Sequence, residues 1–354
     1  MRFNVLGNTG LYVSELCLGA MTFGGKGFWE VVGKLGTKEA LGIVGTAFDA
    51  GVNFVDTADV YTQGESERIV GELIEPDRER WVLASKVANQ MGDDPNHRGS
   101  SRRWIMQAVR DSLRRLRTDR IDVYYLHLDD EATPLEESLR AMDDLMRAGD
   151  VVYMGLSNFR SWRIAEAVHL CRDMGIPRPV VCQPYYHAFL RQVEVELLPA
   201  CAHYGLGVVP YSPLARGLLT GKYDPDAAPP ADTRAGRGDS LSVRMMNSEW
   251  RRGSLLLAQQ VKAHAESKGM TSGQFALNWV LNNALVTAAM PGPRTLEQWL
   301  ENLDALNHPF DAADEAFIDS LVAPGHPSTP GFSDPLYPLR GRVPRSGAVP
   351  PPHG

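Results

Sequence analysis

The sequence predicts a (β/α)8 barrel, the α/β fold in which eight parallel strands close into a cylinder inside a ring of helices. Three observations support this prediction. Short apolar runs alternate with amphipathic helical stretches, eight such runs occur, and the sequence lacks the GxGxxG turn that usually follows the first strand of a doubly wound sheet. The 354 residues are enough for one large barrel of this type.

The first predicted elements are a hairpin and eight strands. In residues 2–15, Gly7-Asn8 and Thr9-Gly10 separate extended stretches, a pattern that predicts an N-terminal β-hairpin ahead of the barrel. The eight predicted strands are Leu16–Gly19, Val52–Val55, Trp81–Ala84, Ile121–Leu126, Val151–Leu156, Val180–Cys182, Leu206–Val209 and Leu285–Ala289. Each is short enough for a strand that is buried on both faces.

Helix start signals lie between these strands. Ser101 stands before residues 104–116, and Pro134 stands near the first turn of residues 135–146. Both stretches have the apolar spacing of an amphipathic helix. Because each strand is followed by a helix that crosses back over the sheet, we expect the strands to run parallel, and eight such units can close on themselves.

Two segments interrupt this rhythm. Residues 211–250 are rich in Gly, Pro, Asp and Arg, show no helical period, and are longer than a compact domain usually tolerates without a function. We interpret them as a binding loop. From Pro324 the chain is rich in Pro and Gly, so we expect a barrel domain over residues 1–323 and a tail over residues 324–354 that wraps the surface or is disordered.

The composition excludes several classes of partner. The hydrophobic content is 44%, the formal net charge is −7, and Lys and Arg are scattered, which argues against binding to nucleic acid. No apolar stretch is long enough to span a membrane and no signal-peptide pattern opens the chain, so we expect a cytoplasmic protein. The four cysteines have no metal-ligand spacing. A small-molecule partner is therefore expected, whereas the oligomeric state is left open.

Reactive side chains follow three consecutive predicted strands. Asp56 and Tyr61 follow the second strand, Lys86 follows the third, and His127 follows the fourth. Later strands end in Ser157-Asn158, Gln183 and Tyr211-Ser212. The carboxyl ends of barrel strands form one mouth, where active sites are built. Taken singly, each residue has an ordinary structural explanation, but packing alone does not explain four of them at one mouth.

This group of residues supports proton transfer to a carbonyl oxygen. A phenol has a pKa of about 10, and an ammonium beside it stabilises the phenolate and lowers that pKa. A carboxylate beside the ammonium keeps it charged and oriented, and a histidine opposite can position the carbonyl. A barrel hydrolase that uses Asp56 with Asp129 or Asp130 is an alternative, but it leaves Lys86 and Tyr61 without a role.

The segment Asp56-Thr-Ala-Asp-Val-Tyr61, followed by Gly64-Glu-Ser-Glu67, closely resembles the signature of the aldo-keto reductase superfamily. Further segments resemble motifs of the family in the family order: Ala84-Ser-Lys86, Tyr124-Tyr-Leu-His127, Gly155-Leu-Ser-Asn158-Phe, Gln183-Pro-Tyr-Tyr186, Tyr211-Ser-Pro-Leu and Gly217-Leu-Leu-Thr-Gly-Lys222-Tyr. The resemblance covers roughly residues 1–320.

The resemblance implies a catalytic tetrad of Asp56, Tyr61, Lys86 and His127 and an NADPH (NADP+) molecule that lies extended across the barrel mouth. Residues implied at the cofactor are Ala20, Met21, Asp56, Ser157, Asn158, Gln183, Tyr211, Ser212, Pro213, Leu214, Arg216, Gly217, Lys222, Arg234, Gly292, Arg294, Gln298, Glu301 and Asn302. Among these, Ser157, Asn158 and Gln183 are implied at the nicotinamide carboxamide. Arg294 is implied at the 2′-phosphate.

The resemblance also bears on the substrate and on a second alternative. Phe28, Trp29 and Phe159 are expected to face a small carbonyl substrate, an aldehyde or a ketone that the sequence does not identify. A regulatory subunit resembling the potassium-channel β subunits would keep the cofactor site but act as a binding module. His127 argues against that alternative, because those relatives have Asn there. His187 stands where many relatives have Asn.

Overall fold

The computed structural model describes residues 1–25, 32–231 and 240–331, together with Thr233, Ala235, Gly236, Gly238, Asp334 and Tyr337. Seven strands form one parallel sheet in chain order: β3 (Cys17–Gly19), β4 (Phe54–Asp56), β5 (Val82–Val87), β6 (Ile121–Leu126), β7 (Val151–Ser157), β8 (Val181–Gln183) and β9 (Gly207–Val208). Register pairs such as Asp56 with Ala84 and Lys86 with Tyr125 align the ends of neighbouring strands. The predicted parallel α/β architecture is confirmed.

Two single-residue bridges close the sheet into a barrel. Ala289 bridges Leu16 and Met290 bridges Tyr211, both in parallel. The Cys17 N–H donates to the Ala289 carbonyl at 2.9 Å. The eighth strand therefore lies later and is shorter than the predicted Leu285–Ala289, because the Asn283 side chain accepts the Leu285 N–H at 3.0 Å and holds the preceding residues in a turn.

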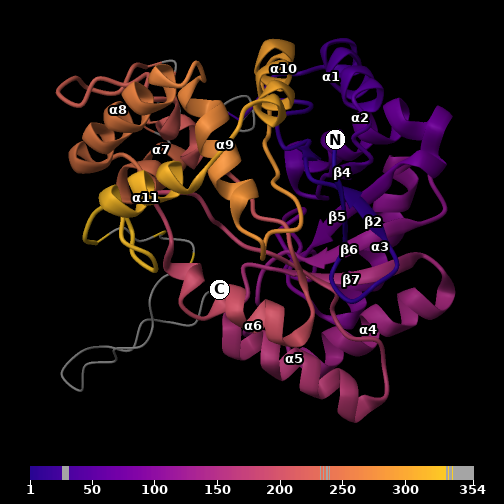
Figure 1. The fold of residues 1–354 in the computed structure, drawn as a ribbon. Helices are drawn as coiled ribbons and strands as arrows, with labels where there is room; N and C mark the ends of the chain where they lie inside the picture. The colour runs from indigo at the N-terminus through magenta and orange to yellow at the C-terminus, as the bar shows by residue number, and fades with distance from the viewer. Residues whose placement is uncertain are drawn as a thin grey trace.

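Helices cover the outside of the sheet, as Figure 1 shows for α1 to α6 around the labelled strands. The α-helices are α1 (Thr37–Asp49), α2 (Glu65–Ile74), α3 (Arg102–Leu116), α4 (Leu135–Ala148), α5 (Ser161–Met174), α6 (Leu197–Tyr204), α7 (Ser240–Asn247), α8 (Arg252–Ser267), α9 (Ser272–Asn282), α10 (Leu296–Asp304) and α11 (Ala312–Leu321). Short 3-10 helices are η2 (Tyr61–Gly64), η3 (Glu75–Arg80), η4 (Gln192–Glu194), η5 (Ala215–Thr220) and η6 (Ala305–Asn307). The predicted Ser101 cap is present, since its hydroxyl accepts the Trp104 N–H at 3.3 Å.

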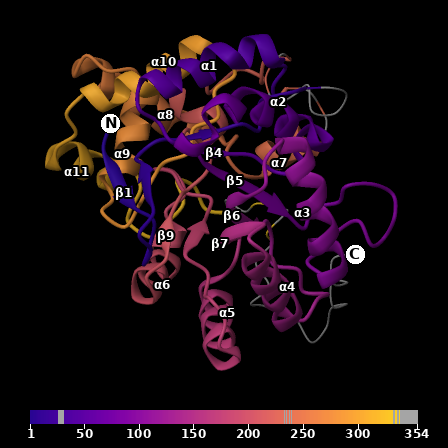
Figure 2. The ribbon, with the colours of Figure 1, turned by 90° about the vertical axis from the view of Figure 1, so that its right-hand side faces the viewer.

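The predicted hairpin closes the amino-terminal end of the barrel. Strands β1 (Phe3–Val5) and β2 (Tyr12–Ser14) pair antiparallel. The Asn8 N–H donates to the Gly205 carbonyl at 2.8 Å, which places the hairpin beside the start of β9 (Figure 2). Because the hairpin occupies this end, a site inside the barrel is open only at the carboxyl ends of the strands.

Side chains inside the barrel follow the two-residue period of a strand. The inner cluster consists of Leu6, Val13, Cys17, Phe54, Val82, Ala84, Val123, Tyr125, Val181, Val209, Ala288 and Met290. A larger cluster fills the space between the strands and the surrounding helices. On β5, Val82 and Ala84 face inward, so the same alternation turns Lys86 inward at the mouth.

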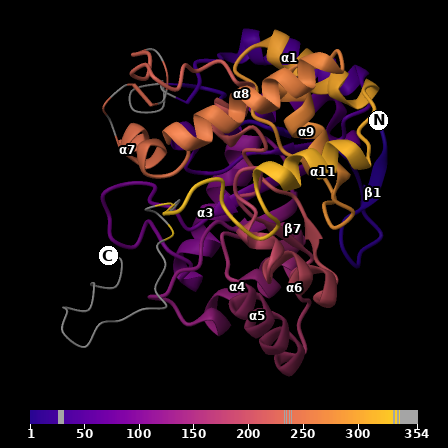
Figure 3. The same ribbon diagram turned by 60° about the vertical axis from the view of Figure 1, so that its left-hand side comes forward.

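The two irregular segments differ from their sequence interpretation in part. Residues 211–250 contain η5 and α7, although no helical period is visible in the sequence. Residues 324–331 lie against the barrel, because the Ser328 N–H donates to the Phe189 carbonyl at 2.9 Å and the Arg191 N–H donates to the His326 carbonyl at 3.1 Å. Helices α8, α9 and α11 pack together on this side (Figure 3). Within the described part of the chain, no helix is long and apolar enough to cross a membrane.

Gly71 and Gly45 offer a matched test of helix packing. A Cβ on Gly71 in α2 would lie 2.5 Å from the backbone of Leu116, whereas a Cβ on Gly45 in α1 meets nothing within 4 Å. We expect Gly71→Ala to lower the free energy of unfolding by about 1–3 kcal/mol, because backbone cannot rearrange as a side chain does. Gly45→Ala should raise it by up to about 1 kcal/mol through helix propensity. Urea unfolding of both variants checks this. A Gly71→Ala protein whose free energy of unfolding equals that of the parent would contradict the close packing of α2 on α3.

Candidate functional site

The barrel mouth brings together the four residues of the predicted tetrad. Asp56 is the last residue of β4, Lys86 is the last but one of β5, and His127 follows β6. Each lies at an inward-facing position, two residues beyond an inner-cluster residue, which are Phe54, Ala84 and Tyr125 in that order. Tyr61 comes from η2, which follows β4. The rings of Tyr61 and His127 meet edge to face with centroids 5.9 Å apart.

Lys86 is the centre of this group. Its ammonium donates to a carboxylate oxygen of Asp56, to the carbonyl of Thr57 at 2.8 Å and to the hydroxyl oxygen of Tyr61 at 3.2 Å. These three contacts use the three N–H bonds of the ammonium. Burial disfavours the charged form, but the charges and hydrogen bonds of Asp56 and Tyr61 together outweigh it and raise the pKa of Lys86. Lys86 is therefore a fixed cation in a fully buried position.

Asp56 is held from both sides. Its second carboxylate oxygen accepts an N–H of the Gln183 side chain at 2.8 Å, and both residues are buried. Gln183 was implied at the nicotinamide carboxamide, and in the structure one of its amide hydrogens is directed to Asp56 instead. The carboxylate is thereby oriented so that it faces the ammonium and cannot rotate freely.

Tyr61 keeps its proton in this environment. Burial raises the pKa of Tyr61, and the opposing effect of Lys86 is smaller. The expectation that Lys86 brings this pKa below its usual value is therefore wrong, because removing a phenolate from water costs more than one nearby ammonium returns. Lys86 donates to the phenol oxygen of Tyr61, so the phenol oxygen is the acceptor of this hydrogen bond.

His127 is held as a neutral ring. Its backbone N–H donates to the Val87 carbonyl at 2.8 Å and its carbonyl accepts from the Asn158 amide at 2.9 Å. Burial, followed by the charges of Lys86 and Arg244, lowers the pKa of His127 well below its usual value. Its buried Nδ1 makes no hydrogen bond within the described part of the chain. The ring can therefore contribute a hydrogen bond without carrying a charge.

A polar wall follows β7 and β9 beside these residues. Asn158 donates to the Ser157 hydroxyl at 3.0 Å and accepts from the Tyr211 hydroxyl at 2.8 Å. Tyr211 stacks on Tyr185 with ring centroids 5.2 Å apart. Asn158 has a φ of 62°, a left-handed conformation that a non-glycine residue adopts at some cost in energy. This wall presents amide and hydroxyl groups to the mouth.

Backbone strain gathers at this end of the barrel. Eight non-glycine residues in the described part of the chain have positive φ, and all but the helix-capping Arg117 follow a strand. Ser212, Ala215 and Arg216 lie in the loop after β9, with φ of 56°, 49° and 53°. Such strain persists where the surrounding structure imposes it, and it concentrates at functional sites. Pro213, Leu214 and Gly217, which were implied at the pyrophosphate, belong to the same loop.

Further implied cofactor residues lie at the ends of β3 and near α10. The Ala20 N–H donates to the Asp56 carbonyl at 2.8 Å, and Met21 follows it. Arg294 is exposed, and its N–H donates to the Gln298 side chain at 2.8 Å. Gly292 and Lys222 are also exposed.

Two of the implied cofactor residues on α10 are not freely accessible. Glu301 accepts a hydrogen bond from Thr271, and Asn302 is buried.

Several expected residues lie elsewhere. Phe159 belongs to the core between strands and helices and is 3% exposed, so it offers no open face to a substrate. Phe28, Trp29 and Arg234 lie outside the described residues. Of the carboxylates in the hydrolase alternative, Asp129 pairs with Arg163 at 2.9 Å. Asp130 accepts the Ser100 N–H at 2.8 Å.

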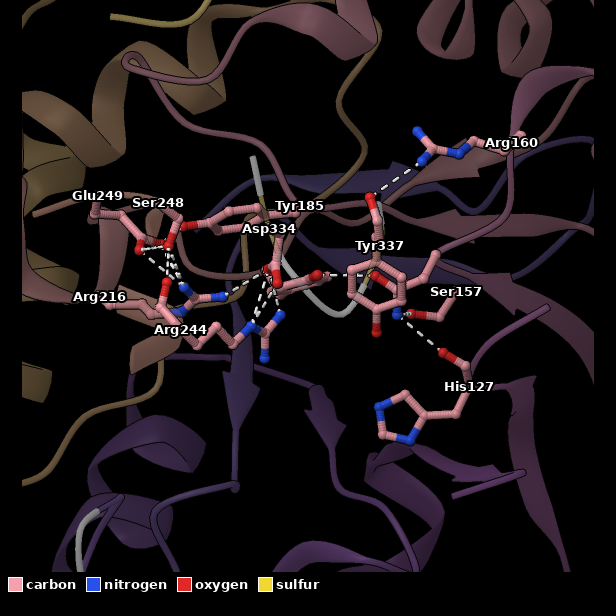
Figure 4. Close-up of polar contacts among 12 residues, drawn as sticks. His127, Ser157, Arg160, Tyr185, Arg216, Arg244, Ser248, Glu249, Asp334 and Tyr337 are labelled. Atoms are coloured by element: carbon pink, nitrogen blue, oxygen red, sulfur yellow. Dashed lines mark hydrogen bonds and ion pairs between the residues drawn. The ribbon is translucent and has the colours of Figure 1, made fainter. Parts of the chain in front are cut away.

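Three charged residues that the sequence interpretation missed, Arg244, Glu249 and Asp334, gather around Arg216, which was implied at the cofactor. Arg244 of α7 and Arg216 both contact Asp334, and Glu249 pairs with Arg216 (Figure 4). Arg244 and Asp334 are 90 positions apart, so no local pattern connects them. No group of three or more potential metal ligands occurs among the residues that the structure describes.

The chain is similar to known proteins over most of its length. Residues 15–323 match the Aldo/keto reductase family. A probable voltage-gated potassium channel subunit beta of Oryza sativa subsp. japonica is 36% identical over 313 residues, which are 87% of this chain and 92% of that protein. A similarly described protein of Arabidopsis thaliana is 35% identical over 87% of this chain and 92% of its own. An uncharacterized oxidoreductase of Bacillus subtilis, YrpG, is 36% identical over 88% and 93%.

His187, which follows β8, gives the site a testable acid sensitivity. Burial and the charge of Arg216 lower the pKa of His187 to about 3. An unfolded histidine takes up a proton below a pKa of about 6.5. Between pH 6.5 and 3 the unfolded chain therefore binds one proton more than the folded chain at this histidine. As the pH is lowered through this range, the free energy of unfolding decreases by up to about 1.4 kcal/mol per pH unit. His187→Asn should weaken this dependence in urea unfolding between pH 7 and 5.

The exposed His203 in α6 supplies the control. His203→Asn should keep the pH dependence of the parent, because this substitution leaves the buried His187 in place. If His187→Asn and the parent show equal slopes of unfolding free energy against pH, the folded protein accepts the proton at His187 and the assignment is wrong.

Proposed function

The chain belongs to the aldo/keto reductase family, and from this premise we propose that it reduces the carbonyl group of an aldehyde or ketone to an alcohol with NADPH. The observation that carries the proposal is the ammonium of Lys86, which donates to Asp56, Thr57 and Tyr61 from a fully buried position. A buried cation that is fixed on a phenol oxygen is of use where that phenol releases its proton.

Tyr61 is the proposed proton donor. Reduction of a carbonyl leaves negative charge on its oxygen, and the hydroxyl proton of Tyr61 can neutralise that charge. The phenolate that remains lies beside the Lys86 ammonium at 3.2 Å. Burial keeps the pKa of Tyr61 high, so the phenol is protonated before the reaction, and Lys86 stabilises the charge that appears during proton transfer.

His127 is the proposed positioning residue for the carbonyl. A neutral imidazole donates one hydrogen bond, and the edge-to-face contact between the His127 and Tyr61 rings supports the proposal that both groups address the same carbonyl oxygen. Asp56 acts through Lys86, whose charge and direction it maintains. The site therefore supplies a proton, a hydrogen bond and a fixed cation.

The residues around the mouth fit a nicotinamide cofactor. Asn158, Ser157 and Gln183 present amide and hydroxyl groups of the kind that pair with a carboxamide, and Tyr211 presents an aromatic ring. We propose that these residues, with the strained loop after β9, hold the cofactor. NADPH, when bound, supplies the hydride that reduces the carbonyl carbon. Arg294, exposed just before α10, is the proposed contact for the 2′-phosphate.

We also propose one barrel domain over residues 1–323, a separate tail over residues 324–354 and a cytoplasmic location. The domain boundary is supported by the family match, which ends at residue 323.

A regulatory subunit is the second candidate function, and the printed descriptions of two relatives favour it. In that case the chain would bind the cofactor as a sensor. His127 favours the reductase, because it adds a hydrogen-bond donor for the carbonyl oxygen to the proton donor Tyr61 and the cation Lys86. Oxidation of NADPH with a panel of aldehydes and ketones distinguishes the two, since a sensor binds cofactor without substrate-dependent turnover.

Tyr61→Phe tests the proton donor. The variant keeps the ring and loses the hydroxyl, so NADPH should bind with the parent affinity while kcat for an aldehyde falls by about 100- to 10,000-fold. Tyr12→Phe on the exposed hairpin is the matched control and should keep the parent kcat. Cofactor fluorescence and the loss of reduced-nicotinamide absorbance measure the two effects. Turnover by Tyr61→Phe within about threefold of the parent, short of that range, would assign the proton to another group.

Arg294→Gln tests the cofactor assignment. NADPH should bind the parent about 10- to 100-fold more tightly than NADH, because a guanidinium pairs with the additional phosphate in a charge-assisted contact. The variant should lose most of this preference, whereas Arg110→Gln on the exposed side of α3 should retain it. Fluorescence titration gives the four dissociation constants. Equal affinities of the parent for NADPH and NADH would exclude this role of Arg294.

A further inference from the structure

Two arginines at the barrel mouth share one carboxylate of the same chain. Arg244 contacts Asp334 through Nε at 2.9 Å and through a terminal guanidinium nitrogen at 2.6 Å. Arg216 reaches the same carboxylate at 3.3 Å. Figure 4 shows the contacts of Asp334 with both guanidinium groups. The group thus joins the loop after β9, helix α7 and residue 334, three segments that are distant in the sequence.

Arg216 is fixed without help from Asp334. It pairs with the buried Glu249, with an N···O distance of 2.7 Å. Its guanidinium lies 4.9 Å above the centre of the Tyr185 ring, and the Tyr185 hydroxyl donates to Glu249. A guanidinium held by a carboxylate and an aromatic face keeps its place when another ligand leaves.

The positive charge of Arg244 is paired with the carboxylate of Asp334. Among the described residues that pair here, Arg216 and Arg244 are the cations and Glu249 and Asp334 are the acids, and burial raises the pKa of Glu249 well above its usual value. Burial and the nearby charge of Arg244 lower the pKa of Arg216 to about 10. Two guanidiniums held this close repel each other, so removal of the Asp334 carboxylate leaves Arg244 without its paired anion among the described residues and favours another anion there.

This group borders the residues proposed for catalysis. The charge of Arg244 contributes to the lowered pKa of His127. The guanidinium of Arg244 lies 5.8 Å from the centre of the Tyr337 ring, and Tyr337 in turn interacts electrostatically with Tyr61. On the other side, Tyr185 stacks on Tyr211. An anion at Arg244 therefore lies at the same mouth as the proton donor.

We propose that Arg244 and Arg216 form an anion subsite of the reductase, and that Asp334 occupies the position of a carboxylate carried by the carbonyl substrate. The inference rests on the proposed function and specifies its substrate class as aldehydes or ketones that bear an acid group. The contact pattern supports a carboxylate, because Arg244 addresses both Asp334 oxygens with two nitrogens, the forked geometry that a guanidinium offers to a planar acid. A cofactor phosphate is the competing occupant.

Arg244→Gln separates these occupants. The probes are 4-carboxybenzaldehyde and its neutral methyl ester, which differ in charge at one end of the ring. The variant should raise KM for the acid by about 10- to 100-fold, the size of a lost charge-assisted hydrogen bond, and change KM for the ester by less than about twofold. The dissociation constant of NADPH should stay within about twofold of the parent, since the subsite is assigned to the substrate.

Asp334→Asn tests the shared position with both arginines intact. Removing the competing charge should lower KM for 4-carboxybenzaldehyde by about three- to tenfold and leave the ester unchanged. Asp226→Asn is the matched control, because Asp226 pairs with Arg252 at 2.8 Å on an exposed surface. That variant should behave as the parent with both aldehydes.

Each other outcome decides against the inference. Equal effects of Arg244→Gln on the acid and the ester, or a weaker NADPH affinity with no difference between the aldehydes, would assign the arginines to packing or to the cofactor phosphate. An unchanged or raised KM for the acid in Asp334→Asn would remove Asp334 from the substrate position. Turnover of the ester by the parent keeps the proposed reductase function intact in these cases. Absence of turnover with either aldehyde and with the wider carbonyl panel would reject the function itself.

Discussion

The structure of the barrel mouth depends on one buried cation. Lys86 has no exposed surface, and an ammonium in such a place is tolerated only if its charge and its three N–H bonds are satisfied. Asp56 supplies the charge, and Thr57 and Tyr61 supply the remaining acceptors. Removing one partner of a buried ion pair costs more than the pair contributes to stability, so this arrangement constrains every neighbour. Gln183, which fixes the far side of Asp56, is part of the same constraint.

The barrel divides stability and chemistry between its two ends. The hairpin and the inner apolar cluster fill one end and the middle, where alternate strand residues interdigitate. Positive-φ residues such as Asn158 and Ser212 gather at the other end, where the loops leave the strands. The energy cost of those conformations is carried by a core that does not take part in the chemistry. The loops can therefore differ in charge without altering the sheet.

The mouth contains two groups of charged residues, which we call the inner and the outer layer. The inner layer, Asp56 with Lys86, is completely enclosed and closed in its contacts. The outer layer, Arg216 and Arg244 with Glu249 and Asp334, is assembled from loops, α7 and residue 334. Both layers act on His127, because burial and the charges of Lys86 and Arg244 lower its pKa. The inner layer suits a fixed proton transfer, and the outer layer suits the recognition of a ligand that comes and goes.

The sequence by itself determined the parallel barrel and the gathering of Asp56, Lys86 and His127, because strand alternation is a local, two-residue rule that places every second side chain inside. It also indicated Asn158 and Tyr211 through the ends of later strands. Only the tertiary structure decided the contact of Arg244 with Asp334, the burial of Phe159, and the direction of the Tyr61 pKa. Those three depend on desolvation and on segments that meet across long stretches of chain. No pattern within one helix or strand encodes such quantities.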